Sequence, residues 1–244
     1  GMAAVGLKPV MAVYLTFLQR AYEQLICKIA IMHLHEAVCI DRAGIVGADG
    51  ETHQGIFDIS YIRSVPNFTM MSPANYLELD KMLEFALEKM NSPVAIRYPR
   101  GCCEADFNVS DIEYGKCEII ALGEDVTLLC EGQMVAEGIK IKEILERENI
   151  SAELINARFL KPLDIETIKK SAIKTGKIAV LECAVSSGGI GEAVSSDLKN
   201  YDIKVCLINI PDNFVEQGSV SELMKLTGLD AQSAAEDIIK ELFN

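Results

Sequence analysis

Ile40-Asp-Arg-Ala-Gly-Ile-Val-Gly-Ala-Asp-Gly-Glu-Thr-His-Gln-Gly55 leads from an apolar run into a glycine-rich loop, and Tyr14-Leu-Thr-Phe-Leu-Gln-Arg20 begins in the same way. Each stretch follows a short apolar run that is typical of a buried strand. Aromatic, arginine, carboxylate and imidazole side chains then occur in the connection. Parallel α/β folds place ligand-contacting residues at the carboxyl ends of their strands. The two stretches therefore predict an α/β fold with a binding site at one edge of a sheet.

Strand and helix signals alternate along the chain, which is typical of a parallel sheet covered by helices on both faces. In the first half, strands are expected at 10–14, 36–41, 68–72 and 93–98, and helices at 17–31 and 74–90. In the second half, strands are expected at 125–130, 152–156, 177–182 and 203–208, and helices at 133–148, 164–174, 190–199 and the C-terminus. Ser72 is expected to cap the helix at 74–90, with Pro73 in its first turn.

The alternation pauses over a polar stretch that divides the chain in two. We predict the later part of a parallel-sheet domain over 1–101, a linker over 102–122, and a complete doubly wound domain over 123–244. The opening residues 1–6 have the composition of the end of a helix, so further polypeptide is expected before them. The first domain is thus expected to be truncated.

Charge and composition exclude several classes of function. The net charge of −13 is concentrated in residues 106–244, which hold fourteen Lys/Arg and twenty-five Asp/Glu, so nucleic-acid binding is not expected there. No apolar run reaches the roughly 20 residues of a membrane-spanning helix, and the cytoplasm is the expected compartment. The eight cysteines lack metal-ligand spacing, and most lie in apolar runs, as reduced core cysteines do. Neither zinc nor a disulfide framework is expected.

The loop at 49–55 holds the candidate residues for proton transfer. Histidine titrates near neutrality, and a His four residues after an Asp on a glycine-flanked loop can share one cleft with it. Asp49 and His53 are therefore candidate catalytic residues. The alternative is a surface loop whose polar side chains satisfy only their own backbone. His33 and His35 lie in a helix-to-strand connection with no partner pattern, and we expect them to be structural.

Arg42 and Arg100 follow strand ends and are candidate phosphate ligands. Guanidinium groups bind phosphate through two parallel hydrogen bonds, which lysine cannot reproduce. Tyr14 supplies a hydroxyl at another strand end, so the three residues together would form a phosphate clamp. The alternative is that each arginine pairs with a neighbouring carboxylate at the surface.

Two further features admit more than one interpretation. Phe17 lies in the first turn beyond a strand, where an aromatic ring can either stack on a heterocycle or pack into the core. Gly189-x-Gly191 follows the strand at 177–182 and is a two-glycine match to a dinucleotide fingerprint. The same turn serves any tight entry from a strand into a helix, so nucleotide binding there is not expected.

Longer motifs resemble the 1-deoxy-D-xylulose-5-phosphate synthase family. The resembling segments are 14–24, 40–55, 57–63, 94–101, 156–164 and 211–214, in the same order along nearly the whole chain. The first-half motifs favour this synthase over a transketolase or an α-keto-acid dehydrogenase β subunit. The resemblance implies a homodimeric thiamine diphosphate enzyme that condenses pyruvate with D-glyceraldehyde 3-phosphate and releases carbon dioxide, as the first step toward isoprenoids. This chain would supply the later part of the pyrimidine-binding domain and the whole transketolase-type C-terminal domain.

The resemblance also implies roles for individual residues. Tyr14, Arg42 and Arg100 would hold the phosphate of the aldehyde substrate. Asp49 and His53 would bind the donor-derived intermediate and assist proton transfer. These are the residues that the strand-end pattern had selected independently.

The cofactor site implied by the resemblance is only partly present. Phe17 would stack on the aminopyrimidine ring of thiamine diphosphate, with Arg20 nearby. The family's catalytic glutamate, in a Glu-Gln-His-Ala segment, would lie just upstream of the first residue, and the diphosphate and Mg²⁺ ligands on a preceding domain. We therefore expect the chain alone to bind no cofactor or metal and to be inactive. Gln217-Gly218 stands where the family commonly has His-Gly, which leaves a role for that position open.

Two alternatives remain for the function. The chain can be one subunit of a split transketolase-like enzyme that another polypeptide completes. It can also be a non-catalytic dimerisation module, because the acidic second half has no catalytic constellation of its own.

Overall fold

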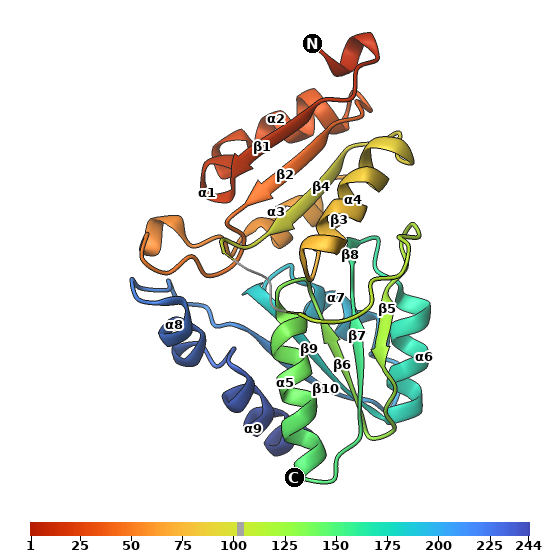
Figure 1. Ribbon diagram of the computed structural model, residues 1–244, viewed down its shortest axis with the longest axis vertical. Helices are drawn as coiled ribbons and strands as arrows, with labels where there is room; N and C mark the ends of the chain where they lie inside the picture. The colour runs from red at the N-terminus through yellow and green to blue at the C-terminus, as the bar shows by residue number, and fades with distance from the viewer. Residues whose placement is uncertain (102–104) are drawn as a thin grey trace.

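Short apolar runs form the strands of two five-stranded sheets, and the connecting helices cover both faces of each (Figure 1). The computed structural model describes residues 1–101 and 105–244. The adjacent pair Cys102-Cys103 and the first three residues of the expected linker lie outside this description. Among the described residues, no helix is both long and apolar enough to cross a membrane. The predicted α/β class with largely parallel sheets is confirmed.

The first sheet has the strand order β1-β2-β4-β3-β8. Its strands are β1 (Val10–Tyr14), β2 (Ala37–Asp41), β3 (Thr69–Met71), β4 (Val94–Tyr98) and β8 (Phe159–Lys161). The first four pair in parallel, whereas β8 comes from the second half of the chain and pairs antiparallel with β3. Sequence reasoning missed β8, because it follows the end of β7 (Ala152–Asn156) after only two residues and does not stand out as a separate apolar run.

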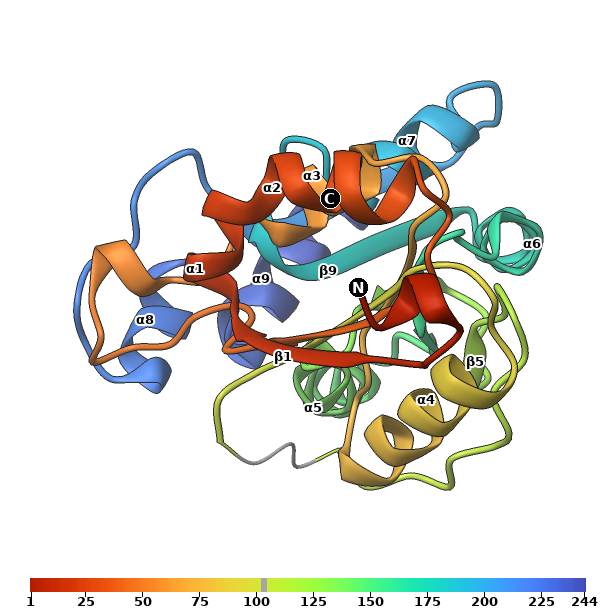
Figure 2. The ribbon, with the colours of Figure 1, turned by 90° about the horizontal axis from the view of Figure 1, so that it is seen from above.

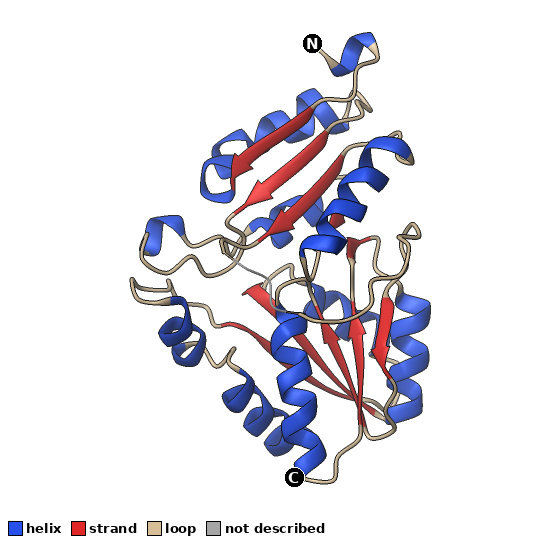
Figure 3. Ribbon diagram, in the orientation of Figure 1, coloured by secondary structure: helices blue, strands red, loops and turns tan. Residues whose placement is uncertain are grey.

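The first unit comprises this sheet and its helices, and the second unit comprises the second sheet and its helices. The helices of the first unit lie on two sides of its sheet (Figures 2 and 3). A helical stretch over 15–30 changes form along its length, from α1 (Leu15–Leu18) through a 3-10 turn and α2 (Tyr22–Gln24) to the π-helical segment Leu25–Ala30. The others are α3 (Asp58–Ser64), which was not predicted, and α4 (Tyr76–Glu88).

The expected cap of α4 was wrong. Asn75, not Ser72, caps this helix, because its Oδ1 accepts a hydrogen bond from the Glu78 N–H at 2.9 Å. The Ser72 hydroxyl instead donates to Glu131 Oε2 at 2.8 Å. The side chain that the sequence offered as a cap is therefore used in a contact between the two halves of the chain.

The second sheet has the order β10-β9-β6-β7-β5, with β5 antiparallel at one edge. Its strands are β5 (Glu118–Ala121), β6 (Val126–Cys130), β7 (Ala152–Asn156), β9 (Lys177–Val185) and β10 (Lys204–Ile210). Its helices are α5 (Met134–Arg147), α6 (Ile165–Thr175), α7 (Ile190–Leu198), α8 (Val220–Leu226) and α9 (Ala231–Leu242). Because β5 lies within 102–122, the stretch expected to be a linker also contributes a strand.

The hydrophobic cores do not follow the division into two units. Ile45 and Ile56, from the first half, belong to the same buried cluster as Leu128 and Val215 from the second. Another buried cluster joins Leu15 and Leu18 with Leu129 and Ile155 (continuous with several further residues of both halves). The two sheets are thus stabilised in part by apolar side chains that each half inserts into the other.

Candidate active site

The candidate site lies at the carboxyl ends of β1, β2 and β4, which finish level with one another. Tyr14 pairs in register with Asp41, and Asp41 with Tyr98, so three strand ends form one edge. Arg42 follows at once, in a left-handed backbone conformation (φ 62°) that is uncommon for a residue with a side chain. The Ala43 N–H donates to Tyr98 O at 3.0 Å and helps to hold the chain there. Unfavourable backbone geometry of this kind clusters at functional sites.

The aromatic side chains at this edge contact one another in a row. The Arg42 guanidinium carbon lies 3.8 Å from the centre of the Tyr14 ring, a cation–π contact. The Tyr14 and Phe17 ring centres are 5.4 Å apart. The Phe17 ring in turn meets His53 edge-to-face, with centres 6.1 Å apart. Residues from two strand ends and from a loop therefore converge on one patch.

Asp49 joins the two candidate phosphate ligands. Its Oδ2 accepts a hydrogen bond from Arg42 Nη1 at 2.7 Å and another from Arg100 Nη1 at 3.3 Å. The alternative of an arginine–carboxylate pair thus holds for both arginines in this structure. Two guanidinium groups share one carboxylate, so the group keeps a net positive charge, and the Arg100 side chain is 51% exposed. A phosphate dianion can still be attracted to this group.

The Thr52 hydroxyl contacts the His53 ring, and the Thr16 hydroxyl holds the backbone beside it. His53 Nδ1 lies 2.9 Å from Thr52 Oγ1, and Thr16 Oγ1 donates to Thr52 O at 2.7 Å. The second contact ties the histidine loop to α1. His53 Nε2 bonds none of the residues that the structure describes, so this nitrogen is free to exchange a proton with a ligand.

The residues expected to contact the cofactor ring suit a planar heterocycle. The Phe17 side chain is 56% exposed, although it is apolar and lies between Tyr14 and His53. Arg20 is exposed a turn later and makes no ion pair within the described part of the chain. An exposed ring flanked by two others is available for stacking. In residues 1–101 and 105–244, no three His, Cys, Asp or Glu side chains gather as a metal site requires.

Comparison with known proteins identifies relatives of this chain. Residues 1–104 match the transketolase pyrimidine binding domain, and residues 115–233 match the transketolase C-terminal domain. The 1-deoxy-D-xylulose-5-phosphate synthase of Crocosphaera subtropica is 40% identical over 100% of this chain, and that of Clostridium tetani is 42% identical over 98%. The chain is similar to 1-deoxy-D-xylulose-5-phosphate synthases over nearly its whole length. It spans 39% of the length of both relatives.

Solved structures add a second kind of relative. A protein described as a split gene transketolase, inactive beta4 tetramer, is 27% identical with a TM-score of 0.91, and the match covers 99% of this chain and 78% of that one. A transketolase from Campylobacter jejuni shares the fold, with 20% identity and a TM-score of 0.76 over 95% of this chain and 35% of its own. The resemblance to 1-deoxy-D-xylulose-5-phosphate synthases that the motifs predicted is confirmed by the curated relatives, and the transketolase domains by the family models.

Sequence reasoning missed a buried ionic network in this protein. Arg97, which is 1% exposed, donates to Asp58 Oδ2 at 2.8 Å and to Glu131 Oε2 at 2.6 Å. Its Nη2 also donates to Cys183 O at 3.3 Å, and Cys183 N–H donates to Glu131 Oε1 at 3.1 Å. An arginine inside the otherwise apolar run 94–98 is a sequence signal for a buried, paired charge.

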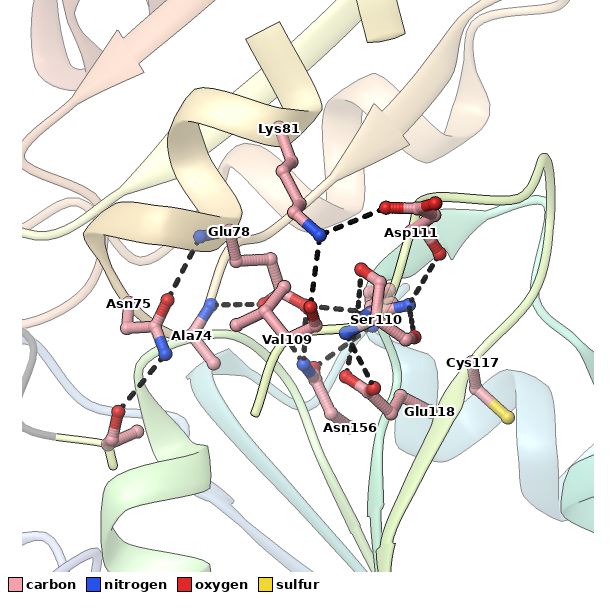
Figure 4. A network of polar contacts seen from close by, with 12 residues as sticks. Ala74, Asn75, Glu78, Lys81, Val109, Ser110, Asp111, Cys117, Glu118 and Asn156 are labelled. Atoms are coloured by element: carbon pink, nitrogen blue, oxygen red, sulfur yellow. Dashed lines mark hydrogen bonds and ion pairs between the residues drawn. The ribbon is translucent and has the colours of Figure 1, made fainter. Parts of the chain in front are cut away.

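A second network joins the units beside β8 (Figure 4). Arg158 Nε donates to Glu78 Oε1 at 2.7 Å, and its Nη2 donates to Glu118. Asn156 Nδ2 donates to both Glu78 carboxylate oxygens at 3.0 Å. The Glu78 carboxylate is fully buried, so each of its oxygens needs these partners.

The glycine-rich turn before α7 has its own internal anion. Glu182 accepts hydrogen bonds from the Ile190 N–H at 2.8 Å and from the Gly191 N–H at 3.1 Å. The helix N-terminus that a dinucleotide phosphate would need is therefore occupied by a carboxylate of the same chain. Burial raises the pKa of Glu182 to about 7, although these N–H groups act in the opposite direction. These contacts support the expectation that no nucleotide binds at this turn.

Proposed function

We propose that this chain supplies the acceptor side of a thiamine diphosphate-dependent site that condenses pyruvate with D-glyceraldehyde 3-phosphate to 1-deoxy-D-xylulose 5-phosphate. Support comes from the family and from one observation in particular. Three separate segments of the chain converge at one edge of the first sheet, and they carry Tyr14, then Arg42 with Asp49 and His53, and finally Arg100. Such convergence is what a small phosphorylated substrate requires.

The roles follow from the chemistry of each group. Arg42 and Arg100 bind the phosphate of the aldehyde, and the Tyr14 hydroxyl donates a further hydrogen bond to it. Asp49 holds both guanidinium groups in place before the substrate binds. His53 moves a proton at the aldehyde oxygen, where negative charge develops as the carbon–carbon bond forms.

Thiamine diphosphate, when bound, supplies the carbanion chemistry that the amino acids cannot provide. Phe17 would stack on its pyrimidine ring, and Arg20 would lie close to it. We propose that the complete enzyme also uses Mg²⁺ and works as a homodimer, as the resemblance implied, and that it resides in the cytoplasm. The chain by itself is proposed to be inactive, since it corresponds to 39% of the length of its synthase relatives. The domain limits 1–101, 102–122 and 123–244 likewise stand as a proposal.

A chimaera tests this function. Residues 1–244 replace the corresponding part of the Clostridium tetani synthase, and carbon dioxide release is measured with pyruvate and D-glyceraldehyde 3-phosphate. The parent chimaera should be active, and His53→Ala should lower kcat at least about 100-fold, as loss of an acid–base group does. Arg42→Met should raise the KM for the aldehyde at least about tenfold, because a charged hydrogen bond is lost.

Arg147→Met is the matched control, because Arg147 is exposed on α5 and far along the chain from the site. It should match the parent in both kcat and KM. Activity of His53→Ala within threefold of the parent would contradict the assigned role.

A second candidate function is a subunit of a split transketolase-like enzyme. It is favoured by the match to the split gene transketolase, of which this chain covers 78%. Mixing the purified chain with a separately expressed diphosphate-binding subunit discriminates the two, since only a split enzyme gains activity on mixing. A non-catalytic dimerisation module would show no activity in either experiment.

A further inference from the structure

We propose that the second unit of this protein holds the catalytic loop in its functional orientation. Gln54 and Gln217 are the positioning residues that connect the loop to this unit. The catalytic loop is defined as residues 43–55, which carry Asp49 and His53. The importance of the loop for catalysis rests on the proposed function. Its attachment to the second unit rests on contacts within the chain alone.

The loop is closed at its base by its own backbone. Gly44 and Gly55 exchange two hydrogen bonds, with N···O distances of 2.6 and 2.7 Å. A Cβ added to Gly55 would lie 2.2 Å from Arg42 O, so no larger residue fits at this crossing. Closure of the base fixes where the loop begins and ends. It does not fix the direction in which the intervening residues point.

The buried Gln54 side chain helps to hold the intervening residues in one orientation. It is only 2% exposed, although it neighbours the partly exposed His53. Its Oε1 accepts from the Val46 N–H at 2.8 Å, which links the two arms of the loop. Its Nε2 donates to Glu216 O at 3.0 Å and to Val215 O at 3.4 Å, in the segment that precedes α8. One buried amide therefore ties both arms to the second unit.

Gln217, in the segment that precedes α8, makes a hydrogen bond to the loop in the reverse sense, from the second unit. Its Nε2 donates to Ala48 O at 3.1 Å, directly before Asp49. The backbone at Gly47 also packs closely on the second unit, because a Cβ there would lie 3.0 Å from Gly218 O. Figures 1 and 2 both show the loop lying against the segment that leads into α8.

Apolar side chains complete the attachment. Ile45 lies near the start of the loop and Ile56 directly follows it, and both are buried in the cluster that contains Val215 and Leu223. The Val185 N–H donates to Ile56 O at 3.0 Å, so β9 also holds the outgoing arm. Asp49 and His53 thus lie between two sets of anchors that the second unit provides. Displacement of a catalytic group by about 1 Å can cost about 100-fold in rate, which is why such anchors matter.

Hydrogen exchange of the purified chain tests the attachment without any activity. In Gln54→Ala, the amides of residues 43–55 should exchange at least about tenfold faster, because a buried donor and acceptor lose their partners. Exchange within β2 and β4 should stay as in the parent. In Gln217→Ala, which removes one exposed hydrogen bond, residues 47–50 should respond in the same direction by a smaller factor.

Gln24→Ala serves as the control, since Gln24 is exposed on α2. It should leave exchange of the loop unchanged. If Gln54→Ala does not fold, Gln217→Ala decides the matter by itself. Unchanged loop exchange in the folded variants, or an increase spread evenly over both sheets, would overturn the proposal.

Kinetics of the chimaera then connect the attachment to catalysis. Gln54→Ala and Gln217→Ala should each lower kcat, the former at least tenfold, while the KM for thiamine diphosphate stays within twofold, since Phe17 lies on α1 and outside the loop. Equal changes in both quantities would indicate general loss of structure and count against positioning. If the parent chimaera is itself inactive, the proposed function fails, whereas the exchange experiment still decides whether the second unit holds the loop.

Discussion

Replacing Arg97 by methionine should destabilise the protein strongly and in a pH-dependent way. The change removes the positive charge between Asp58 and Glu131 while filling most of the same volume. Both carboxylates are fully buried, and neither has another cationic partner within the described residues. Breaking a buried ion pair by removing one partner costs about 3–5 kcal/mol. Out of a total stability of roughly 5–15 kcal/mol, that is a large fraction.

The sign of the pH dependence follows from Asp58. Burial already raises the pKa of Asp58, against the opposing effect of Arg97. Without Arg97, Asp58 loses the charge that favours its ionised form, so its pKa in the folded variant rises further. A carboxyl group whose folded pKa is raised stabilises the fold at low pH and loses that contribution as pH rises. The deficit should therefore be largest near pH 8 and smaller near pH 5.5.

Urea unfolding followed by circular dichroism at these two pH values measures the deficit. Arg147→Met is the exposed control and should stay within about 0.5 kcal/mol of the parent. Adding Asp58→Asn and Glu131→Gln to the Arg97 variant should recover most of the loss, since neutral amides need no counter-charge. A deficit below about 1 kcal/mol, or one that is equal at both pH values, would refute this account of the network.

Three other changes have defined outcomes. In the parent, the pKa of Glu182 is raised to about 7, so the free energy of unfolding should fall by roughly 3 kcal/mol as pH rises from about 5 to 8. Urea unfolding of Glu182→Gln should show a smaller fall over the same pH range. An equal fall in the variant and the parent would contradict the raised pKa. Ser219→Ala removes the capping box of α8 and should cost about 1 kcal/mol, measured by thermal unfolding, with Ser196→Ala on the exposed face of α7 as control. Phe17→Ala should leave the unfolding free energy within about 0.5 kcal/mol, because the ring is exposed, yet weaken binding of thiamine diphosphate to the chimaera roughly tenfold in calorimetry. Equal affinity of both proteins would exclude a stacking role.

Sequence patterns predicted most of the strands and helices because apolar periodicity is a local property; β5 and β8 were missed. The longer strands each appeared as a separate apolar run, and the strand-end position of Tyr14, Arg42 and Arg100 followed from the alternation alone. The short strand β8 left no such trace, and α3 was hidden by its mixed polar residues.

The parts that were missed depend on contacts between distant segments. Ser72 looks like a helix cap in isolation, but its hydroxyl faces Glu131, fifty-nine positions later. Arg97 and Gln54 have the composition of surface residues and are nevertheless among the least exposed side chains of the chain. Whether a polar side chain is buried is decided by the partner that reaches it, and that partner is not visible in a local window.

The strand β8 has a consequence for where a polypeptide of this type can be divided between genes. It completes the first sheet beside β3, and the Ser72 N–H also donates to Arg158 O at 2.9 Å. A break anywhere from residue 101 to residue 158 would separate this strand from its sheet, exposing the unpaired backbone edge of β3 to other chains. Gene fission within that interval would therefore yield fragments that associate through the exposed edge of β3. Evolution should tolerate a break ahead of β1 more readily than one between the two sheets.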